Sequence, residues 1–338
     1  MRRPSHPNPS RLPGIHLLTI SSLEGRGNPS PTLSDLDRPQ IELASVRQLF
    51  ERAPREPGDD FIVRETARRM LERAETMRVA TNRATNSAPM RVLDAGCGPG
   101  ADLAPLRARF PEAIVVGLDA AASRLTRAQS AGRGATSRLA RLLRRPAPSP
   151  LVAADFSAPP FKPQCFDLIW SNLALHWSDA PHRVLPEWAR VTKVGGLVMF
   201  SAFGPDTLAE VAAAFRTLDG DAHVMPFVDM HDYGDMLIAA GFTTPVVDME
   251  RLTLTYSDAA SLWRDVRGLG GNPLTTRRRG LRGRACGKRL ADALDAGRDS
   301  EGRYRLSFEL IFAHAWKAAP RASADESAIV KFHRSPAR

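Results

Sequence analysis

Short apolar segments alternate with helix-like stretches through the middle of the chain. Apolar runs lie at 90–94, 113–118, 151–154, 166–171 and 197–201, and stretches with helical spacing follow at 103–110, 180–191 and 206–218. Strands that alternate with helices in this way predict a mostly parallel sheet with helices on both faces.

Two later segments have the alternation of half-buried strands. Leu252, Leu254 and Tyr256 recur at every second position in 246–256, and Phe308, Leu310 and Phe312 do so in 306–316. We expect this antiparallel pair to close the sheet, which gives seven strands. The core then spans 89–256 and ends with a final strand at 305–318. The intervening residues 257–304 are predicted to form a helical lid.

The regions outside this core have different patterns. Residues 41–88 contain two helix-like runs, with Val46, Leu49 and Phe50 spaced for one face, and we expect them to form an N-terminal helical cap. The Pro-rich segment 1–40 and the tail 319–338 are predicted to be disordered, because they cannot bury enough apolar surface to offset the entropy of ordering. Residues 131–150 are predicted to be a basic loop insertion.

Composition narrows the class of protein. The chain of 338 residues is 43% hydrophobic and has no apolar run long enough for a membrane span. Its three cysteines have no CxxC spacing, and His223 and His231 lack metal-site spacing. We therefore expect no disulfide framework and no metal, and a reducing, cytoplasmic compartment.

The net charge of +10 indicates which kinds of partner the protein could bind, but it does not indicate the fold. Seven arginines and no acid lie within 124–145, a run that we interpret as inert. Nine basic residues and one acid lie within 264–289. Such a surplus fits nucleic acid or an acidic protein, and the charge alone does not choose between them.

A glycine-rich segment carries the clearest chemistry. Gly96, Gly98 and Gly100 follow the first strand and precede a helix, and Asp119 ends the next strand. Glycines let the backbone approach a ligand closely, the helix N-terminus offers free N–H groups, and an acid at that position suits a ribose diol. The segment therefore predicts a nucleotide-type binding loop.

Two ligands compete for this loop. A nicotinamide dinucleotide requires the spacing GxGxxG, whereas this loop is GxGxG and is followed by Asp102. An aspartate there would repel a pyrophosphate, while Asp94 would suit a cationic ammonium or sulfonium. The residues favour S-adenosylmethionine.

Residues 94–100 resemble motif I of class I S-adenosylmethionine-dependent methyltransferases, and 154–156 and 166–172 resemble later motifs of that family. The resemblance implies a Rossmann-like fold. It also implies that Asp94 and the three glycines contact the methionine part, that Asp119 contacts the ribose, and that Asp155 and Phe156 contact the adenine. Asn172 is a further candidate for cofactor binding.

A narrower resemblance links 171–177, 203–208, 223–227 and 267–272 to the BioC family of malonyl-acyl carrier protein O-methyltransferases, which act early in biotin synthesis. The chain lacks the Tyr-Asp pair that many members carry after the first helix and has Gly58-Asp59-Asp60-Phe61 instead. Two of these blocks also resemble mitochondrial complex I assembly factors linked to arginine hydroxylation. An RNA or small-molecule methyltransferase is a further alternative.

A malonyl carboxylate would be ionised at neutral pH and would need no general base. We therefore assign no catalytic acid or base. His176 and Trp177 are candidates for the acceptor pocket, and an unidentified Arg is expected to hold the carboxylate. The arginines that could dock an acidic carrier protein are Arg277, Arg278, Arg279, Arg282 and Arg284. Malonyl-CoA is an alternative acceptor, and we do not expect nucleic acid or membrane as a partner.

Overall fold

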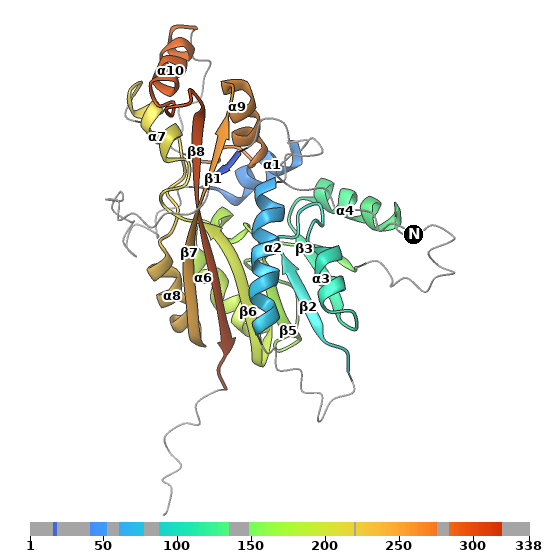
Figure 1. Ribbon diagram of the computed structural model, residues 1–338. Coiled ribbons are helices and arrows are strands. Elements are labelled where there is room, and N and C mark those ends of the chain that lie inside the picture. Colours follow the sequence, from blue (N-terminus) through green and yellow to red (C-terminus); the bar gives the residue numbers. More distant parts are fainter. Residues whose placement is uncertain are drawn as a thin grey trace, which may run out of the picture.

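The computed structural model describes residues 16–18, 41–52, 61–77, 88–134, 149–219, 221–275 and 284–319. In these residues one sheet of eight strands forms the centre of the molecule (Figure 1). The strands are β1 (His16–Leu18), β2 (Arg91–Ala95), β3 (Ile114–Asp119), β4 (Leu151–Ala153), β5 (Phe166–Ser171), β6 (Thr192–Phe203), β7 (Phe242–Tyr256) and β8 (Tyr304–Lys317).

The strand order is β1-β7-β8-β6-β5-β2-β3-β4. Strands β4, β3, β2, β5 and β6 are parallel, and β8 and β7 complete the sheet as an antiparallel pair. The Rossmann-like sheet of seven strands that we expected is therefore confirmed. The short β1 adds an eighth strand by pairing antiparallel with β7.

Alternating side chains of the strands supply two hydrophobic cores. On β2, Val92 belongs to one core and Leu93 to the other, and Leu168 and Ile169 of β5 divide in the same way. This is the period of two that a sheet covered on both faces requires.

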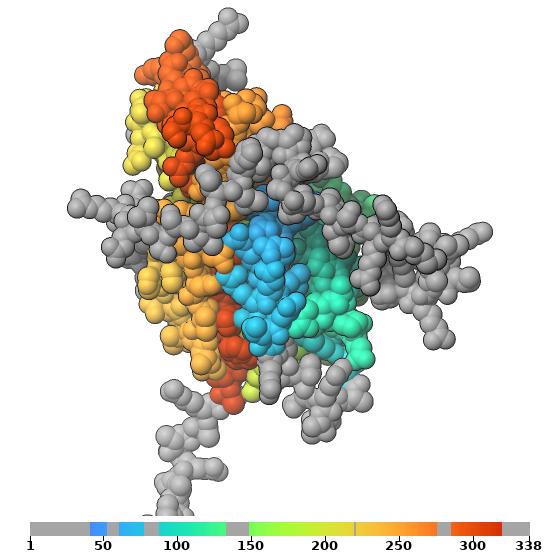
Figure 2. All heavy atoms as spheres, viewed as in Figure 1, coloured from blue at the N-terminus to red at the C-terminus, as the bar shows by residue number. Residues whose placement is uncertain are grey.

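Helices cover both faces of the sheet. The first core receives α1 (Leu43–Arg52), α2 (Phe61–Thr76), α3 (Leu103–Arg109) and α4 (Ala122–Gly134), and the second receives α6 (Pro181–Val191) and α8 (Met230–Ala239). Figure 2 shows α2, in blue, lying across the near face of the molecule.

Strands β7 and β8 extend past the rest of the sheet and carry further helices at their far end (Figure 1). These helices are α7 (Ala209–Arg216), α9 (Ala259–Gly268) and α10 (Arg284–Ala296). The segment after α9 returns to the cap at Gly270, whose backbone has φ +121°. A Cβ atom at Gly270 would lie 2.7 Å from the Phe50 ring and 3.1 Å from the Trp177 ring.

Two predictions of irregular structure are wrong in part. Residues 16–18 form β1, although they belong to the tail predicted to be disordered. Residues 131–134 complete α4, although we assigned them to the loop insertion. The described part of 257–304 contains the two helices α9 and α10, but the rest of 1–40, residues 135–148 and most of 319–338 lie outside the described residues.

Candidate functional site

The glycine loop turns sharply at the end of β2. The backbone N–H groups of Gly96 and Cys97 both donate to the carbonyl oxygen of Leu118 on β3, at 2.8 and 2.9 Å. Gly96 has φ +84°, and a Cβ atom there would lie 2.4 Å from the Cβ of Ala174. Only glycine satisfies both the backbone angle and the close approach.

Asp119 fixes the same loop from the neighbouring strand. One carboxylate oxygen accepts a hydrogen bond from the backbone of Gly98 at 2.8 Å, and the other accepts one from Ala121 at 2.8 Å. The burial of Asp119 raises its pKa, while these two hydrogen bonds and nearby Arg124 oppose the rise. This side chain therefore joins the loop to the start of α4.

Two more carboxyl groups lie against the loop and are almost fully buried. Asp94 is 1% exposed, and its Oδ2 has no hydrogen-bond partner among the described residues. Asp102 is 5% exposed and accepts a hydrogen bond from the indole N–H of Trp170 at 2.8 Å. Burial raises the pKa of both groups, and the charge of Asp102 raises that of Asp94 further.

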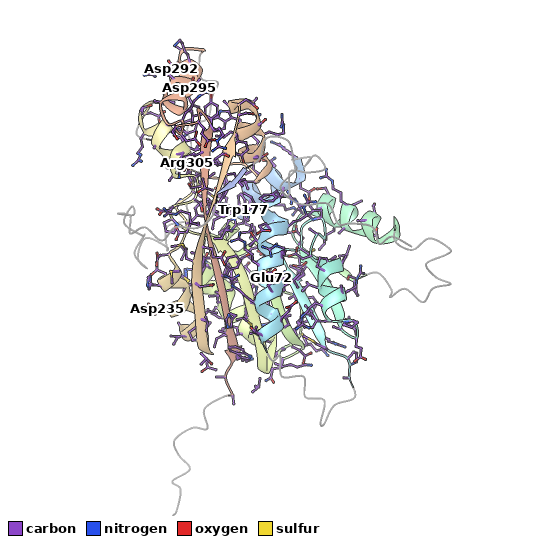
Figure 3. The ribbon with its side chains drawn as sticks, viewed as in Figure 1. Glu72, Trp177, Asp235, Asp292, Asp295 and Arg305 are labelled. Atoms are coloured by element: carbon purple, nitrogen blue, oxygen red, sulfur yellow. The ribbon has the colours of Figure 1, made fainter. Side chains whose placement is uncertain are left out.

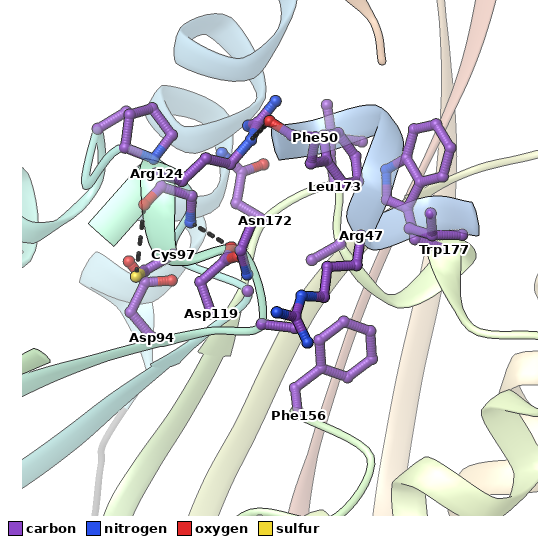
Figure 4. Close-up of a pocket in the computed structure, with 18 of the residues that line it drawn as sticks. Arg47, Phe50, Asp94, Cys97, Asp119, Arg124, Phe156, Asn172, Leu173 and Trp177 are labelled. Atoms are coloured by element: carbon purple, nitrogen blue, oxygen red, sulfur yellow. Dashed lines mark hydrogen bonds between the residues drawn. The ribbon is translucent and has the colours of Figure 1, made fainter. Parts of the chain in front are cut away.

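These groups line a cavity of about 290 Å³ at the carboxyl ends of the central strands (Figure 4). Most of the residues predicted to bind S-adenosylmethionine, the methyl donor, line this cavity: Asp94, Gly96, Gly98, Asp119, Asp155, Phe156 and Asn172. Gly100 is not among the lining residues. It packs under α4, where its added Cβ would lie 2.9 Å from that of Ala128, so its predicted contact with the donor lacks support.

Asn172 differs from the other predicted residues because both polar atoms of its side chain already have partners. Its amide N–H donates to the backbone oxygen of Val63 on α2 at 2.9 Å, and its side-chain oxygen accepts from the hydroxyl of Ser201 on β6 at 2.9 Å. Asn172 therefore joins the cap to the sheet beside the cavity.

The other wall of this cavity comes from the cap helix α1 and from α4. Figure 4 shows Arg47 extending toward the ring of Phe156, and Phe50 lying above the loop. The guanidinium of Arg124 lies 4.2 Å from the centre of the Phe50 ring. Arg124 is 7% exposed and lines this cavity, although it belongs to the basic run that we interpreted as inert.

A second cavity of about 330 Å³ lies on the other side of Trp177. Trp177 lines both cavities and lies near the middle of the molecule, below the helices carried by β7 and β8 (Figure 3). Its ring packs edge-on against Phe50, with 4.8 Å between the ring centres. The second cavity is mainly apolar and is lined by residues of β6, α7, α9 and the segments beside them, including Phe203, Val211, Phe215, Met225, Phe227, Trp263 and Val266.

His176 also lines the second cavity and is 7% exposed. Burial lowers the pKa of His176 to about 3, so the ring is neutral throughout the physiological range. Both predicted acceptor-pocket residues therefore lie at one cavity that adjoins the other.

The arrangement can hold a cationic donor beside an apolar acceptor pocket. A buried, unpartnered carboxylate oxygen and two crowded carboxyl groups favour a ligand with positive charge and disfavour a pyrophosphate. The residues present therefore fit S-adenosylmethionine, which has a sulfonium and an ammonium group.

The sequence assigned no individual role in these walls to Phe50, Val63 or Arg267, because they come from segments far from the glycine loop, although 267–272 belongs to a block that resembles the BioC family. Helical spacing gave one signal, since it assigned Phe50 to the buried face of its helix. Of the predicted docking residues, Arg277, Arg278, Arg279 and Arg282 lie outside the described residues, and Arg284 begins α10 without a described side chain. Among the described residues, no helix is both long enough and apolar enough to cross a membrane.

Comparisons with known proteins agree with this geometry. Residues 93–200 match the family described as Methyltransferase domain. A malonyl-[acyl-carrier protein] O-methyltransferase of Laribacter hongkongensis is 43% identical over 297 residues, which are 86% of this chain and 96% of the relative. A protein of the same name from Gallionella capsiferriformans is 38% identical over 293 residues, again 86% of this chain and 96% of the relative.

Among solved structures, the YcgJ protein of Bacillus subtilis matches with a TM-score of 0.51 and 17% identity. The match covers 75% of this chain and all of that chain. At this identity the likeness supports the fold alone.

Proposed function

The chain belongs to the family of malonyl-[acyl-carrier protein] O-methyltransferases, and from that premise we propose that it methylates the free carboxylate of a malonyl thioester on acyl carrier protein. The methyl donor is S-adenosylmethionine, and the reaction is an early step of biotin synthesis. No disulfide bond joins Cys97, Cys165 and Cys286 in the described residues, which fits a reducing cytoplasm.

One observation carries this proposal most directly. Trp177 is shared by an acid-lined cavity under the glycine loop and by a largely apolar cavity under the lid helices. A donor in the first cavity and an acceptor in the second would meet at this ring.

The residues of the first cavity supply charge and position for the donor. Asp94 and Asp102 lie where an ammonium group would satisfy them, and Asp119 and Asp155 would contact the ribose and the adenine. The ring of Phe156 would pack on the base. When bound, S-adenosylmethionine supplies an electrophilic methyl group on a sulfonium, which becomes a neutral thioether as the carboxylate oxygen takes the methyl group.

The acceptor oxygen needs no base, because carboxyl groups ionise near pH 4. The protein contributes alignment and exclusion of water, and alignment of this kind is worth up to ~7–11 kcal/mol in favourable cases. Neutral His176 and the aromatic wall around Trp177 exclude water without competing for protons.

Acyl carrier protein itself would dock through the basic segment at Arg277–Arg279, Arg282 and Arg284. The support for this part is the positive charge of the segment, since an acidic partner is steered by opposite charge.

The direct test uses methyl-labelled S-adenosylmethionine with malonyl-acyl carrier protein. We expect label in an ester that base releases as methanol, and no label with acetyl-acyl carrier protein, which lacks the free carboxylate. Binding of the donor without any transfer to the malonyl form would refute the proposal.

A further inference from the structure

The second cavity contains few polar side chains, and the structure accounts for most of them. Thr207 donates its hydroxyl to the backbone oxygen of Glu309 at 3.2 Å and accepts from the backbone N–H of the same residue at 3.2 Å. Asn272 donates to the backbone oxygen of His223 at 2.7 Å and accepts from the N–H of Leu274 at 2.9 Å. The hydrogen bonds of Thr207 and Asn272 therefore stabilise the walls of the cavity.

His223 is occupied as well. Its Nε2 is paired with the carboxylate of Asp219 at 2.8 Å, and its ring stacks on Phe215 with 3.9 Å between the ring centres. It therefore belongs to the wall rather than to the polar groups open to a ligand.

His176 and Arg267 are polar side chains of this cavity that could meet a ligand, since each has a donor without a hydrogen-bond partner among the described residues. The backbone N–H of Phe203 donates to Nδ1 of His176 at 3.4 Å, so in the neutral ring Nε2 carries the hydrogen. That Nε2–H is buried and has no acceptor among the described residues. His176 thus presents one neutral donor without an acceptor.

Arg267 is the second polar side chain of this cavity that could meet a ligand. It lies on α9 four residues after Trp263 and next to Val266, and both of these residues also line the cavity. No described residue forms an ion pair with its guanidinium, and the residue is exposed at the rim of the cavity that it lines. An arginine at the edge of an apolar cavity suits a small anion with planar oxygens, such as a carboxylate.

We propose that Arg267 and His176 recognise the free carboxylate of the acceptor, and that Arg267 determines the preference for an acid over a neutral acyl group. This inference rests on the proposed function. One solvent-exposed cation and one neutral donor bind a carboxylate without fully neutralising it, so the attacking oxygen keeps its nucleophilicity.

The test compares two small thioesters, malonyl-pantetheine and acetyl-pantetheine, which differ by the carboxylate and avoid any contribution from a carrier protein. Binding is measured by calorimetry in the presence of saturating S-adenosylhomocysteine. We expect the wild-type protein to prefer the malonyl compound by roughly 10-fold or more, and Arg267→Gln to abolish that preference. Arg264→Gln is the matched control, since Arg264 lies on the same helix but does not line the cavity.

The role of His176 is tested by a pair of variants. His176→Phe keeps an aromatic ring and removes the donor, whereas His176→Gln keeps an N–H near the position of Nε2. We expect kcat/KM for malonyl-pantetheine to fall roughly 10-fold in the first variant and to recover in part in the second. Unchanged affinity for S-adenosylhomocysteine shows that both variants are folded.

Failure of this inference can be told apart from failure of the proposed function. If the wild-type protein methylates malonyl-pantetheine but Arg267→Gln still discriminates against the acetyl compound, the assignment of Arg267 is wrong. Wild-type protein that binds both thioesters equally, or neither, also overturns it. If the preference for the malonyl compound depends on Arg267 but no methyl group is transferred, the carboxylate site is supported and the proposed reaction is refuted.

Discussion

At the scale of single residues, the most consequential groups are the two acids buried under the glycine loop. Burial raises the pKa of Asp102 to about 6 and that of Asp94 well above its usual range. The free protein therefore holds at least one proton there in mildly acidic solution. A cationic ligand favours the ionised carboxylates, so its binding must release that proton.

This linkage predicts that the affinity for S-adenosylmethionine rises with pH. We expect the affinity to rise roughly 10-fold between pH 5 and pH 7. Below the pKa of Asp102 the ligand must displace a proton from that carboxyl group, whereas above this pKa the proton has already been lost. Calorimetry in two buffers with different heats of ionisation should report proton release at pH 5.5. Asp102→Asn should flatten the profile, and a flat profile in the wild-type protein would contradict the prediction.

A second prediction concerns the close approach at Gly96. Gly96→Val puts a branched side chain at φ +84° and against Ala174, so we expect loss of measurable S-adenosylhomocysteine binding. Circular dichroism checks that the variant folds. Ala101→Val in the same loop is the control for a larger side chain at the cavity wall. Normal affinity in the Gly96 variant would count against the loop as the donor site.

At the scale of elements, the sequence predicted the strands better than the helices. Strands β2 to β5 are short apolar runs, and β6 contains such a run at its centre, which is the pattern of strands buried on both faces. Helix α8 was not predicted, because its apolar residues pack on a strand pair that lies later in the chain. The last turn of α4 was missed because its two glycines, Gly132 and Gly134, are typical of loops.

A prediction at this scale concerns the hydrogen bonds that join α2 to β6 through Asn172. Asn172→Ala removes the hydrogen bond to the Val63 carbonyl and leaves the buried Ser201 O–H without its acceptor, although the Ser201 oxygen still accepts from the N–H of Leu173. We expect the free energy of unfolding to fall by about 1–3 kcal/mol, measured by urea denaturation. Ser130→Ala, which removes an exposed hydroxyl bond to the preceding turn of α4, should change it by less than ~0.5 kcal/mol.

At the scale of the whole molecule, the donor site was predictable in large part, whereas only His176 and Trp177 of the acceptor cavity were predicted. The donor residues cluster in sequence around the glycine loop, where spacing alone indicates their chemistry. The second cavity joins β6, α7, α9 and the segments beside them, and only the folded chain brings His176 and Arg267 to one wall. A lone arginine among many has no local pattern that marks it.

The docking of a carrier protein also belongs to this scale. Reversing the charge of Arg277, Arg278 and Arg279 to Glu should lower kcat/KM for malonyl-acyl carrier protein by roughly 10-fold at low salt and much less at high salt. The rate with malonyl-pantetheine should not change. An equal loss with both acceptors would show that the segment does not act as a docking surface.

Gly270 places one hydrogen atom where three distant parts of the chain converge: the cap at Phe50, the centre at Trp177 and the lid segment after α9. No side chain fits between these two rings. The three parts therefore pack closely at Gly270, and a single methyl group there would push them apart. Because Trp177 lines both cavities, a side chain at position 270 would alter the shape of both of them together.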